Sequence, residues 1–234
     1  MISLSPATEE ASGTHPKLQR RCGVSRSAAR LARDPEGASY DSARRVWNGR
    51  IDRRPALIAY CANQADVASA VRFARERELL AAVRSGGHSC AGTAVCDGGL
   101  VIDLSLMKAI EMDAPRGTVR AQAGVLWAEL DRATQASGLA VPGGTDSEVG
   151  IAGLTLGGGN GWLMGLCGAT CDNLVAADLV MADGRSIFSE RRRECRPVLG
   201  GAGRRRKFWD RHLAPLSSSH RWSDGHRRHG LVCV

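Results

Sequence analysis

The sequence predicts an α+β domain, and three observations lead to this fold class. Glycine is abundant, at 28 residues, while aromatic residues make up only 4% of the chain, which favours a loop-rich mixed fold over a helical bundle. Residues 55–85 have the pattern strand, helix, strand, which is typical of a βαβ unit with parallel strands. Residues 108–124 have the pattern of a β-hairpin, so antiparallel pairing is expected as well.

The βαβ unit is the best-defined part of the pattern. Pro55–Asn63 is a short apolar strand, and Gln64–Glu78 carries apolar residues at helical spacing, with Asn63 or Asp66 as its N-cap. Leu79–Ser85 is the next strand. A right-handed crossover should place the two strands in parallel pairing.

The remaining elements are less regular. We expect a strand at 99–107, a hairpin turn at 114–117, a helix at 125–138 and a strand–turn–strand at 173–188 with its turn at 182–184. The segment between the helix and the last strand pair is too rich in glycine for regular structure over its length.

The chain divides into three parts by composition. Residues 1–39 are polar and weakly patterned, so we expect a mostly disordered segment with a short helix near 25–33. Residues 40–188 form the expected domain, and residues 189–234 form a basic tail that we expect to be disordered. The net charge of +8 comes entirely from this tail, because residues 1–188 are electrically balanced.

Composition also argues against several functions. No apolar run is long enough to cross a membrane, and no apolar signal region follows the N-terminus, so we expect a cytoplasmic protein without membrane contact. The eight cysteines show no paired metal-ligand spacing, so we expect no metal and reduced thiols. A nucleic-acid-binding arm is an alternative for the tail, although it lacks interleaved aromatic residues.

Two glycine-rich segments are candidates for binding a phosphate-bearing ligand. They are RSGGHSCAG, at 84–92, and a longer run from 139 to 162. Consecutive backbone N–H groups in a tight loop bind anions, and glycine permits close approach. Neither segment has the lysine of a nucleotide-hydrolysing P-loop, and neither supports a Rossmann fingerprint. Glycine turns in a β-rich domain remain the alternative.

Taken in order, the motifs resemble a known family. They are RSGGHSCAG, VIDLSLMKAIEMD, VRAQAGVLWAELDRATQASGLAVPGGTDSEVGIAGLTLGGGNGWLM and DNLVAADLVMADGR. Together they resemble the FAD-linked oxidases of the vanillyl-alcohol oxidase or PCMH type, in particular the berberine-bridge-enzyme-like members. The resemblance implies a PCMH-type FAD-binding domain of two α/β subdomains, at about 40–110 and 111–188, with FAD between them and the substrate domain absent.

The resemblance also assigns the cofactor site. It implies that His88 is joined covalently to the 8α carbon of FAD, and imidazole is a suitable nucleophile. A loop histidine hydrogen-bonded to backbone is the alternative. The backbone of 85–89 would hold the pyrophosphate, and the second segment would line the flavin. The implied cofactor-binding residues are Arg84, Ser85, Gly86, Gly87, His88, Ser89, Pro142, Gly143, Gly144, Thr145, Val149, Gly150, Gly153, Gly157, Gly158, Gly161, Asn173 and Val175.

The chain departs from the family at three places. Asp146 stands where doubly linked members have a cysteine, so no second covalent bond is expected. Residues 165–168 replace an Arg-Lys-Tyr-Gly run, which removes flavin contacts. From Arg193 to Leu213 every codon, read one nucleotide out of phase, can encode the family residue. We therefore expect a frameshift after about residue 190 and a C-terminally truncated domain.

The implied function is that of an FAD-dependent oxidoreductase. It would oxidise a small-molecule substrate by hydride transfer to FAD, and oxygen would reoxidise the flavin. No catalytic base and no oligomeric state can be assigned from the residues present. The alternatives are an inactive remnant of the flavin domain and, for the basic tail, a nucleic-acid-interacting protein.

Overall fold

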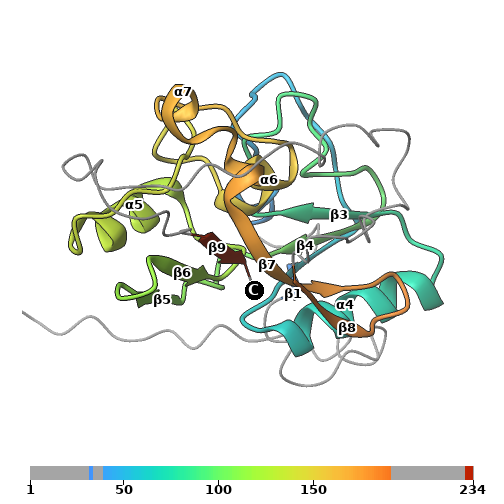
Figure 1. Ribbon diagram of the computed structural model, residues 1–234. Helices are drawn as coiled ribbons and strands as arrows, with labels where there is room; N and C mark the ends of the chain where they lie inside the picture. Colours follow the sequence, from blue (N-terminus) through green and yellow to red (C-terminus); the bar gives the residue numbers. More distant parts are fainter. Residues whose placement is uncertain (1–31, 34–38, 191–229, 234) are drawn as a thin grey trace, which may run out of the picture.

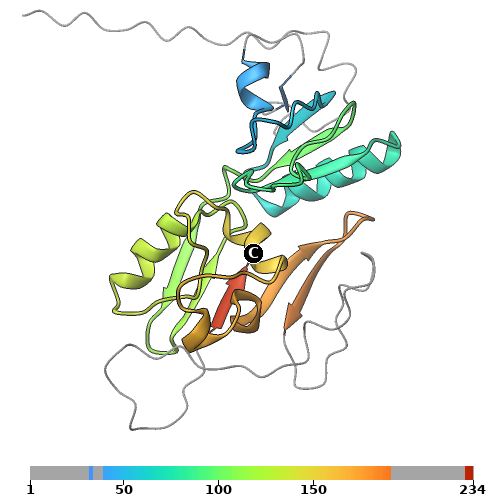
Figure 2. The ribbon, with the colours of Figure 1, turned by 90° about the horizontal axis from the view of Figure 1, so that it is seen from above.

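The structure is a computed structural model that describes residues 32–33, 39–190 and 230–233 (Figure 1). The described strands form two sheets, one with the order β1-β2-β4-β3 and one with the order β5-β6-β9-β7-β8. Figure 2 shows the two sheets as separate lobes, with α4 on the first lobe and α5 beside β5 and β6 in the second. The α+β fold class and the two-lobed arrangement predicted from the sequence are confirmed.

The first lobe has a central, fully buried strand. Its elements are β1 (Ala32–Arg33), α3 (Tyr40–Ala43), β2 (Leu57–Tyr60), α4 (Gln64–Glu76), β3 (Ala81–Arg84) and β4 (Leu100–Asp103). Strand β4 pairs in parallel with β2 on one side and with β3 on the other. Every residue of β4 is buried, as expected for a strand covered on both faces.

The βαβ prediction was right in its elements and wrong in its pairing. Strands β2 and β3 run parallel, but β4 lies between them, so they are not neighbours. The central position buries β4 on both faces, which suits its apolar residues Leu100, Val101 and Ile102. Leu100 and Ile102 pack toward α4, while Val101 packs against Val95 and Cys96 on the opposite face.

Helix α4 begins where its polar residues predict. The side chain of Asn63 accepts a hydrogen bond from the Asp66 backbone N–H at 3.0 Å, so Asn63 is the N-cap. The Asp66 carboxylate in turn accepts from the backbone of Ala62 at 3.1 Å. The apolar face of α4 places Phe73 against the sheet, and α4 also contacts β7 of the second lobe.

The second lobe is a mixed sheet with short helices around it. Its elements are β5 (Ile110–Asp113), β6 (Thr118–Ala121), α5 (Trp127–Gln135), α6 (Ile151–Leu156), α7 (Met164–Cys167), the 3-10 turn η1 (Thr170–Asn173), β7 (Leu174–Val180), β8 (Ser186–Glu190) and β9 (Gly230–Cys233). The predicted hairpin is β5–β6, and Gly117 adopts a φ of 60° in its turn. The predicted strand–turn–strand is β7–β8.

Three expectations for this chain need correction. The glycine-rich segment 139–162 contains one short helix, α6, because the apolar run from Ile151 buries Ile151 and Thr155 against the lobe, and α7 follows the segment. Residues 32–33 form strand β1, not the end of a helix. Residues 230–233, which we expected to be disordered, form β9, whose backbone fills the place between β6 and β7. Residues 189–190, at the start of the expected tail, belong to β8. Most of the two segments expected to be disordered, including the run 193–213 for which we expect a frameshift, lies outside the described residues.

Candidate functional site

The first glycine-rich loop begins at a buried ion pair. Arg84 ends β3, and its register partner on β4 is Asp103. The Arg84 Nε donates to the Asp103 Oδ2 at 2.5 Å, and both side chains are more than nine-tenths buried. The Nη1 of Arg84 donates to the Arg45 carbonyl at 3.3 Å. Arg84 therefore fixes the start of the loop, and these two nitrogens bond within the fold.

The loop that follows has free backbone donors. None of the backbone N–H groups of residues 85–89 donates a hydrogen bond to another residue that the structure describes. Gly87 adopts a φ of 74°, which turns the chain in a way that other residues rarely adopt. Buried or half-buried N–H groups normally have partners. A run of five consecutive free donors is suited to an anion such as a pyrophosphate.

The side chains of this loop bind elsewhere in the protein. The Ser85 hydroxyl donates to the Ala123 carbonyl at 2.6 Å, which joins the loop to the second lobe. The Ser89 and Thr93 hydroxyls lie 2.7 Å apart and share a hydrogen bond. The two serine hydroxyls are therefore engaged within the protein, and the backbone N–H groups of the loop are the donors left to bind a ligand.

The two glycine-rich segments meet at two glycines. A Cβ atom on Gly86 would lie 2.4 Å from the Gly150 backbone nitrogen and 2.9 Å from the Glu148 carbonyl oxygen. A Cβ atom on Gly150 would lie 2.2 Å from the Ser85 Oγ and 2.4 Å from the Gly86 nitrogen. The close approach of the two backbones requires glycine at both positions. The structure thus brings together two segments that the sequence predicted to border one ligand.

The second segment folds back on itself around Trp127. A Cβ on Gly143 would lie 2.5 Å from the Trp127 ring, and a Cβ on Gly161 would lie 1.6 Å from the Gly143 carbonyl oxygen. Pro142–Gly144 therefore lies between the indole and the 157–161 turn. Thr145, Gly153 and Gly157 are exposed, Val149 and Gly158 are half-buried, and Val175 is half-buried in β7.

Three buried polar atoms along this segment have no partner among the described residues. They are the Trp127 Nε1, the Thr170 Oγ1 and the Asn173 Oδ1. The Nδ2 of Asn173 donates to the carbonyls of Cys167 and Ala169, each at 3.0 Å, so only its acceptor oxygen is left. A Cβ on Gly159 would lie 2.3 Å from the Thr170 Oγ1. Unpaired buried polar atoms are costly, and their gathering here fits a segment that binds a polar group.

His88 lies in the loop with both ring nitrogens available. It is half-buried, and neither nitrogen hydrogen-bonds to a described residue. Its ring instead stacks on Trp47, with the ring centroids 5.5 Å apart and the planes at 22°.

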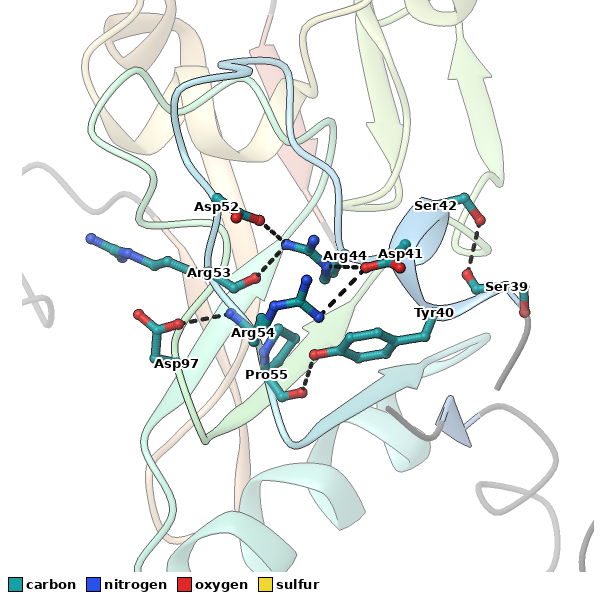
Figure 3. A network of polar contacts seen from close by, with 10 residues as sticks. All are labelled: Ser39, Tyr40, Asp41, Ser42, Arg44, Asp52, Arg53, Arg54, Pro55 and Asp97. Atoms are coloured by element: carbon teal, nitrogen blue, oxygen red, sulfur yellow. Dashed lines mark hydrogen bonds and ion pairs between the residues drawn. The ribbon is translucent and has the colours of Figure 1, made fainter. Parts of the chain in front are cut away.

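Residues 39–55 support this loop from outside the motif. Figure 3 shows Arg44 between two carboxylates: its Nε donates to Asp41 at 2.8 Å, and its Nη1 donates to Asp52. The Arg54 N–H donates to Asp97 at 2.7 Å, and the Tyr40 hydroxyl donates to the Pro55 carbonyl at 2.7 Å (Figure 3). Of these bonds, only that from Arg54 to Asp97 leaves the segment, and the other three hold 39–55 together within the first lobe.

Sequence reasoning missed three residues that shape the site. Trp47 contacts His88, Asp103 pairs with Arg84, and Trp127 lies under the second glycine-rich segment. Trp47 carries no sequence signal, because it stands alone about forty residues before the loop. Asp103 could have been found, since it ends a strand of the same parallel sheet as Arg84, but its pairing depends on the strand order.

Other kinds of site receive no support from the residues described. No group of three or more histidine, cysteine or acidic side chains in 39–190 could hold a metal ion. Within the described chain, no helix is both long enough and apolar enough to span a bilayer. Four cysteines of this part, at 61, 90, 96 and 167, carry free thiols.

Residues 55–188 match the model of a family described as "FAD binding domain". The chain is 39% identical over 171 residues to (R)-6-hydroxynicotine oxidase of Paenarthrobacter nicotinovorans. The aligned residues cover 72% of this chain and 37% of the relative. The crystal structure of 6-hydroxy-D-nicotine oxidase from Arthrobacter nicotinovorans superposes with a TM-score of 0.67 at 39% identity, over 68% of this chain and 35% of the other.

A second solved structure gives the same result at lower identity. BBE-like 1 of Physcomitrella patens superposes with a TM-score of 0.66 at 29% identity, over 68% of this chain and 35% of the other. The chain spans about a third of the length of the relatives that it matches.

Proposed function

The chain belongs to the FAD binding domain family, and on this premise we propose that it is the flavin-binding portion of an FAD-dependent oxidoreductase. Bound FAD would supply the redox chemistry by accepting a hydride from a small organic substrate and passing the electrons to oxygen. The protein's own residues would bind and orient the cofactor. The observation that carries the proposal is the run of free N–H groups at 85–89, joined to the second glycine-rich segment by Gly86 and Gly150.

The loop after β3 would hold the pyrophosphate. Its five backbone N–H donors are suited to an anionic ligand. The buried Arg84–Asp103 pair keeps the loop at a fixed place on the sheet. Arg84 would act mainly through this anchoring, because its Nε and Nη1 already bond within the protein. This refines the role implied by the resemblance, from direct contact to support.

The second segment would lie along the flavin. Pro142–Thr145, Val149–Gly150, Gly153, Gly157–Gly161, Asn173 and Val175 would line it, and the unpaired oxygen of Asn173 fits a polar cofactor nearby. Asp146 is exposed, and its carboxylate accepts from the Glu148 N–H at 2.8 Å. A carboxylate cannot form the thioether that a cysteine forms, so a single covalent bond is proposed.

His88 would form that bond. Its two ring nitrogens are free of hydrogen bonds to described residues, so a lone pair is available for attack on the 8α carbon. The test is to express the full chain, reconstitute it with FAD and denature it. Yellow colour that stays with the wild-type polypeptide, and dissociates from His88→Ala, supports the proposal. Cys90→Ser is the matched control, because Cys90 is exposed two residues away and should leave attachment intact.

The reconstitution with FAD also separates an inactive remnant from a domain that binds FAD reversibly. A protein that binds no FAD would be a remnant that keeps only the fold. A protein that binds FAD reversibly, with wild type and His88→Ala alike, would keep the flavin site and contradict the covalent bond. Nucleic-acid binding by the basic tail would show as a strong dependence of affinity on salt, which we do not expect.

The wider setting is also part of the proposal. The relatives bear the names of oxidases and oxidoreductases, and the chain spans about a third of them, so substrate and electron acceptor would depend on the whole protein. The free thiols among the described residues support a reducing compartment such as the cytoplasm.

A further inference from the structure

The aromatic ring beside His88 is not part of the glycine-rich motif. Trp47 is 59% exposed, yet its indole lies nearly parallel to the imidazole of His88, with the centroids 5.5 Å apart. An exposed tryptophan stacked on an otherwise unpartnered histidine restricts the imidazole to one side of the loop. It does so without hydrogen-bonding to either ring nitrogen.

Three bonds hold the segment of Trp47 to the loop of His88. The Trp47 N–H donates to the Gly87 carbonyl at 3.2 Å, and the Asn48 Nδ2 donates to the Cys90 carbonyl at 2.9 Å. These contacts lie on either side of His88 in the chain. The third bond runs from Arg84 to the Arg45 carbonyl. The indole is therefore placed by one backbone bond and two side-chain-to-backbone bonds, and not by its own exposed surface.

The segment is also fixed at its far side. Arg44, with a side chain only 12% exposed, binds Asp41 and Asp52, and it also donates to the Arg53 carbonyl at 3.2 Å. Figure 3 shows that these residues come from the turn of α3 and from the irregular run before β2. The side chain of Arg53 reaches the carbonyls of Gly92 and Val95, each at 3.0 Å. The segment thus contacts the loop before and after His88.

We propose that Trp47 is a positioning residue for the covalent attachment of flavin to His88, an inference that rests on the proposed function. The stack holds the imidazole in one rotamer, so that its free nitrogen faces the cofactor. The π face of the indole also stabilises the positive charge that develops on the imidazole during attack.

The attachment step balances without a further protein group. One imidazole nitrogen forms a bond to the 8α carbon, an 8α C–H bond breaks, and the imidazole N–H proton leaves. The two electrons and two protons released reduce the isoalloxazine ring of the same FAD. Oxygen then takes them up as H2O2 and restores the oxidised ring. Trp47 enters only through the orientation and charge of His88.

The experiment compares Trp47→Leu and Trp47→Phe with wild type in the full chain. We measure the rate of covalent incorporation by mass spectrometry and the reversible affinity for FAD in a His88→Ala background. Trp47→Leu should slow attachment by roughly tenfold or more, because loss of alignment removes proximity effects. Trp47→Phe, which keeps a ring, should slow it by roughly two- to threefold. Neither should change the reversible affinity by more than about twofold.

Two further readouts keep a folding defect apart from a positioning defect. The ring current of Trp47 should displace the C–H resonances of His88 in the NMR spectrum of the flavin-free protein, and Trp47→Leu should abolish this displacement. Phe188→Leu is the matched control, because Phe188 is an exposed aromatic residue on β8, 62% exposed, and should leave both readouts unchanged.

Each possible result leads to a different conclusion. Attachment by Trp47→Leu at the wild-type rate overturns the role of Trp47 and leaves the proposed function standing. Equal losses of attachment and of reversible affinity would show a general defect of the site, and would also overturn it. Absence of covalent flavin in the wild type overturns both the covalent bond and the role of Trp47.

Discussion

Replacement of Gly86 by alanine should separate the two glycine-rich segments. The added Cβ would lie 2.4 Å from the Gly150 nitrogen, whereas ordinary contacts begin at 3.4 Å, so the two backbones must move apart by about 1 Å. Both partners are backbone, and neither can rotate away as a side chain could. Overpacking of this kind costs about 1–3 kcal/mol of the free energy of unfolding.

Thermal unfolding followed by circular dichroism measures this cost. For a chain of this size, 1 kcal/mol lowers Tm by roughly 2–4 °C, so Gly86→Ala should lower it by roughly 2–12 °C. The same displacement should weaken FAD binding, since the pyrophosphate loop and the flavin segment no longer align. Gly165→Ala is the control, because its Cβ would meet no atom within 4 Å and its site is in α7. A Gly86→Ala variant with wild-type Tm and wild-type affinity for FAD would refute the reasoning.

The other predictions concern the anchoring pair, the thiols and the tail. Arg84→Met should lower the free energy of unfolding by about 3–5 kcal/mol, because it leaves the Asp103 carboxylate buried without its ion-pair partner. The double variant Arg84→Met/Asp103→Leu should recover most of this loss. A denaturant titration measures both. Burial, followed by the charges of Asp66 and Asp103, raises the pKa of the Cys61 thiol to about 12. The folded protein thus favours the neutral thiol. The resulting contribution to the free energy of unfolding is complete below the ordinary thiol pKa of 9.0 and is lost as the pH rises toward 12. Cys61→Ala should therefore flatten the fall in stability over that pH range. A thiol-alkylating reagent should label Cys90 in the native protein and leave Cys61 unlabelled, which peptide mapping would show. Resequencing through the codons of 183–234 should reveal a one-base shift near Arg193, and an unchanged reading frame would contradict that hypothesis.

The sequence predicted most elements of the fold but not their arrangement. Strands, the helix α4 and the hairpin follow from local periodicity and turn residues, which need no knowledge of distant parts. The insertion of β4 between β2 and β3 does not follow from local pattern, because it depends on contacts between strands that are distant in the sequence. Helix α6 was missed for a similar reason: glycine lowers local helix propensity, and burial of Ile151 overrides it.

The candidate site shows the same division. The glycine loops carry a recognisable pattern, and the structure brings them together at Gly86 and Gly150. The residues that hold them, Asp103 and Trp47, come from a neighbouring strand and from the segment between α3 and β2, so the glycine loops themselves contain no sign of them. A cofactor motif names the backbone that meets the ligand, while the supporting side chains depend on tertiary contacts.

The position of the site between the two lobes couples binding to stability. Ser85 donates to Ala123, and a Cβ on Gly124 would lie 1.8 Å from the Leu104 carbonyl oxygen, so the loop 85–89 lies where the backbones of the two lobes touch. A ligand bound by both segments would oppose the separation of the lobes, and its binding energy would add to the free energy of unfolding. Substitutions at this contact should therefore weaken binding and stability together, whereas His88→Ala, which removes the proposed nucleophile, should abolish the proposed covalent bond and leave the fold intact. That contrast would separate the residues that build the site from the residue that we propose to react in it.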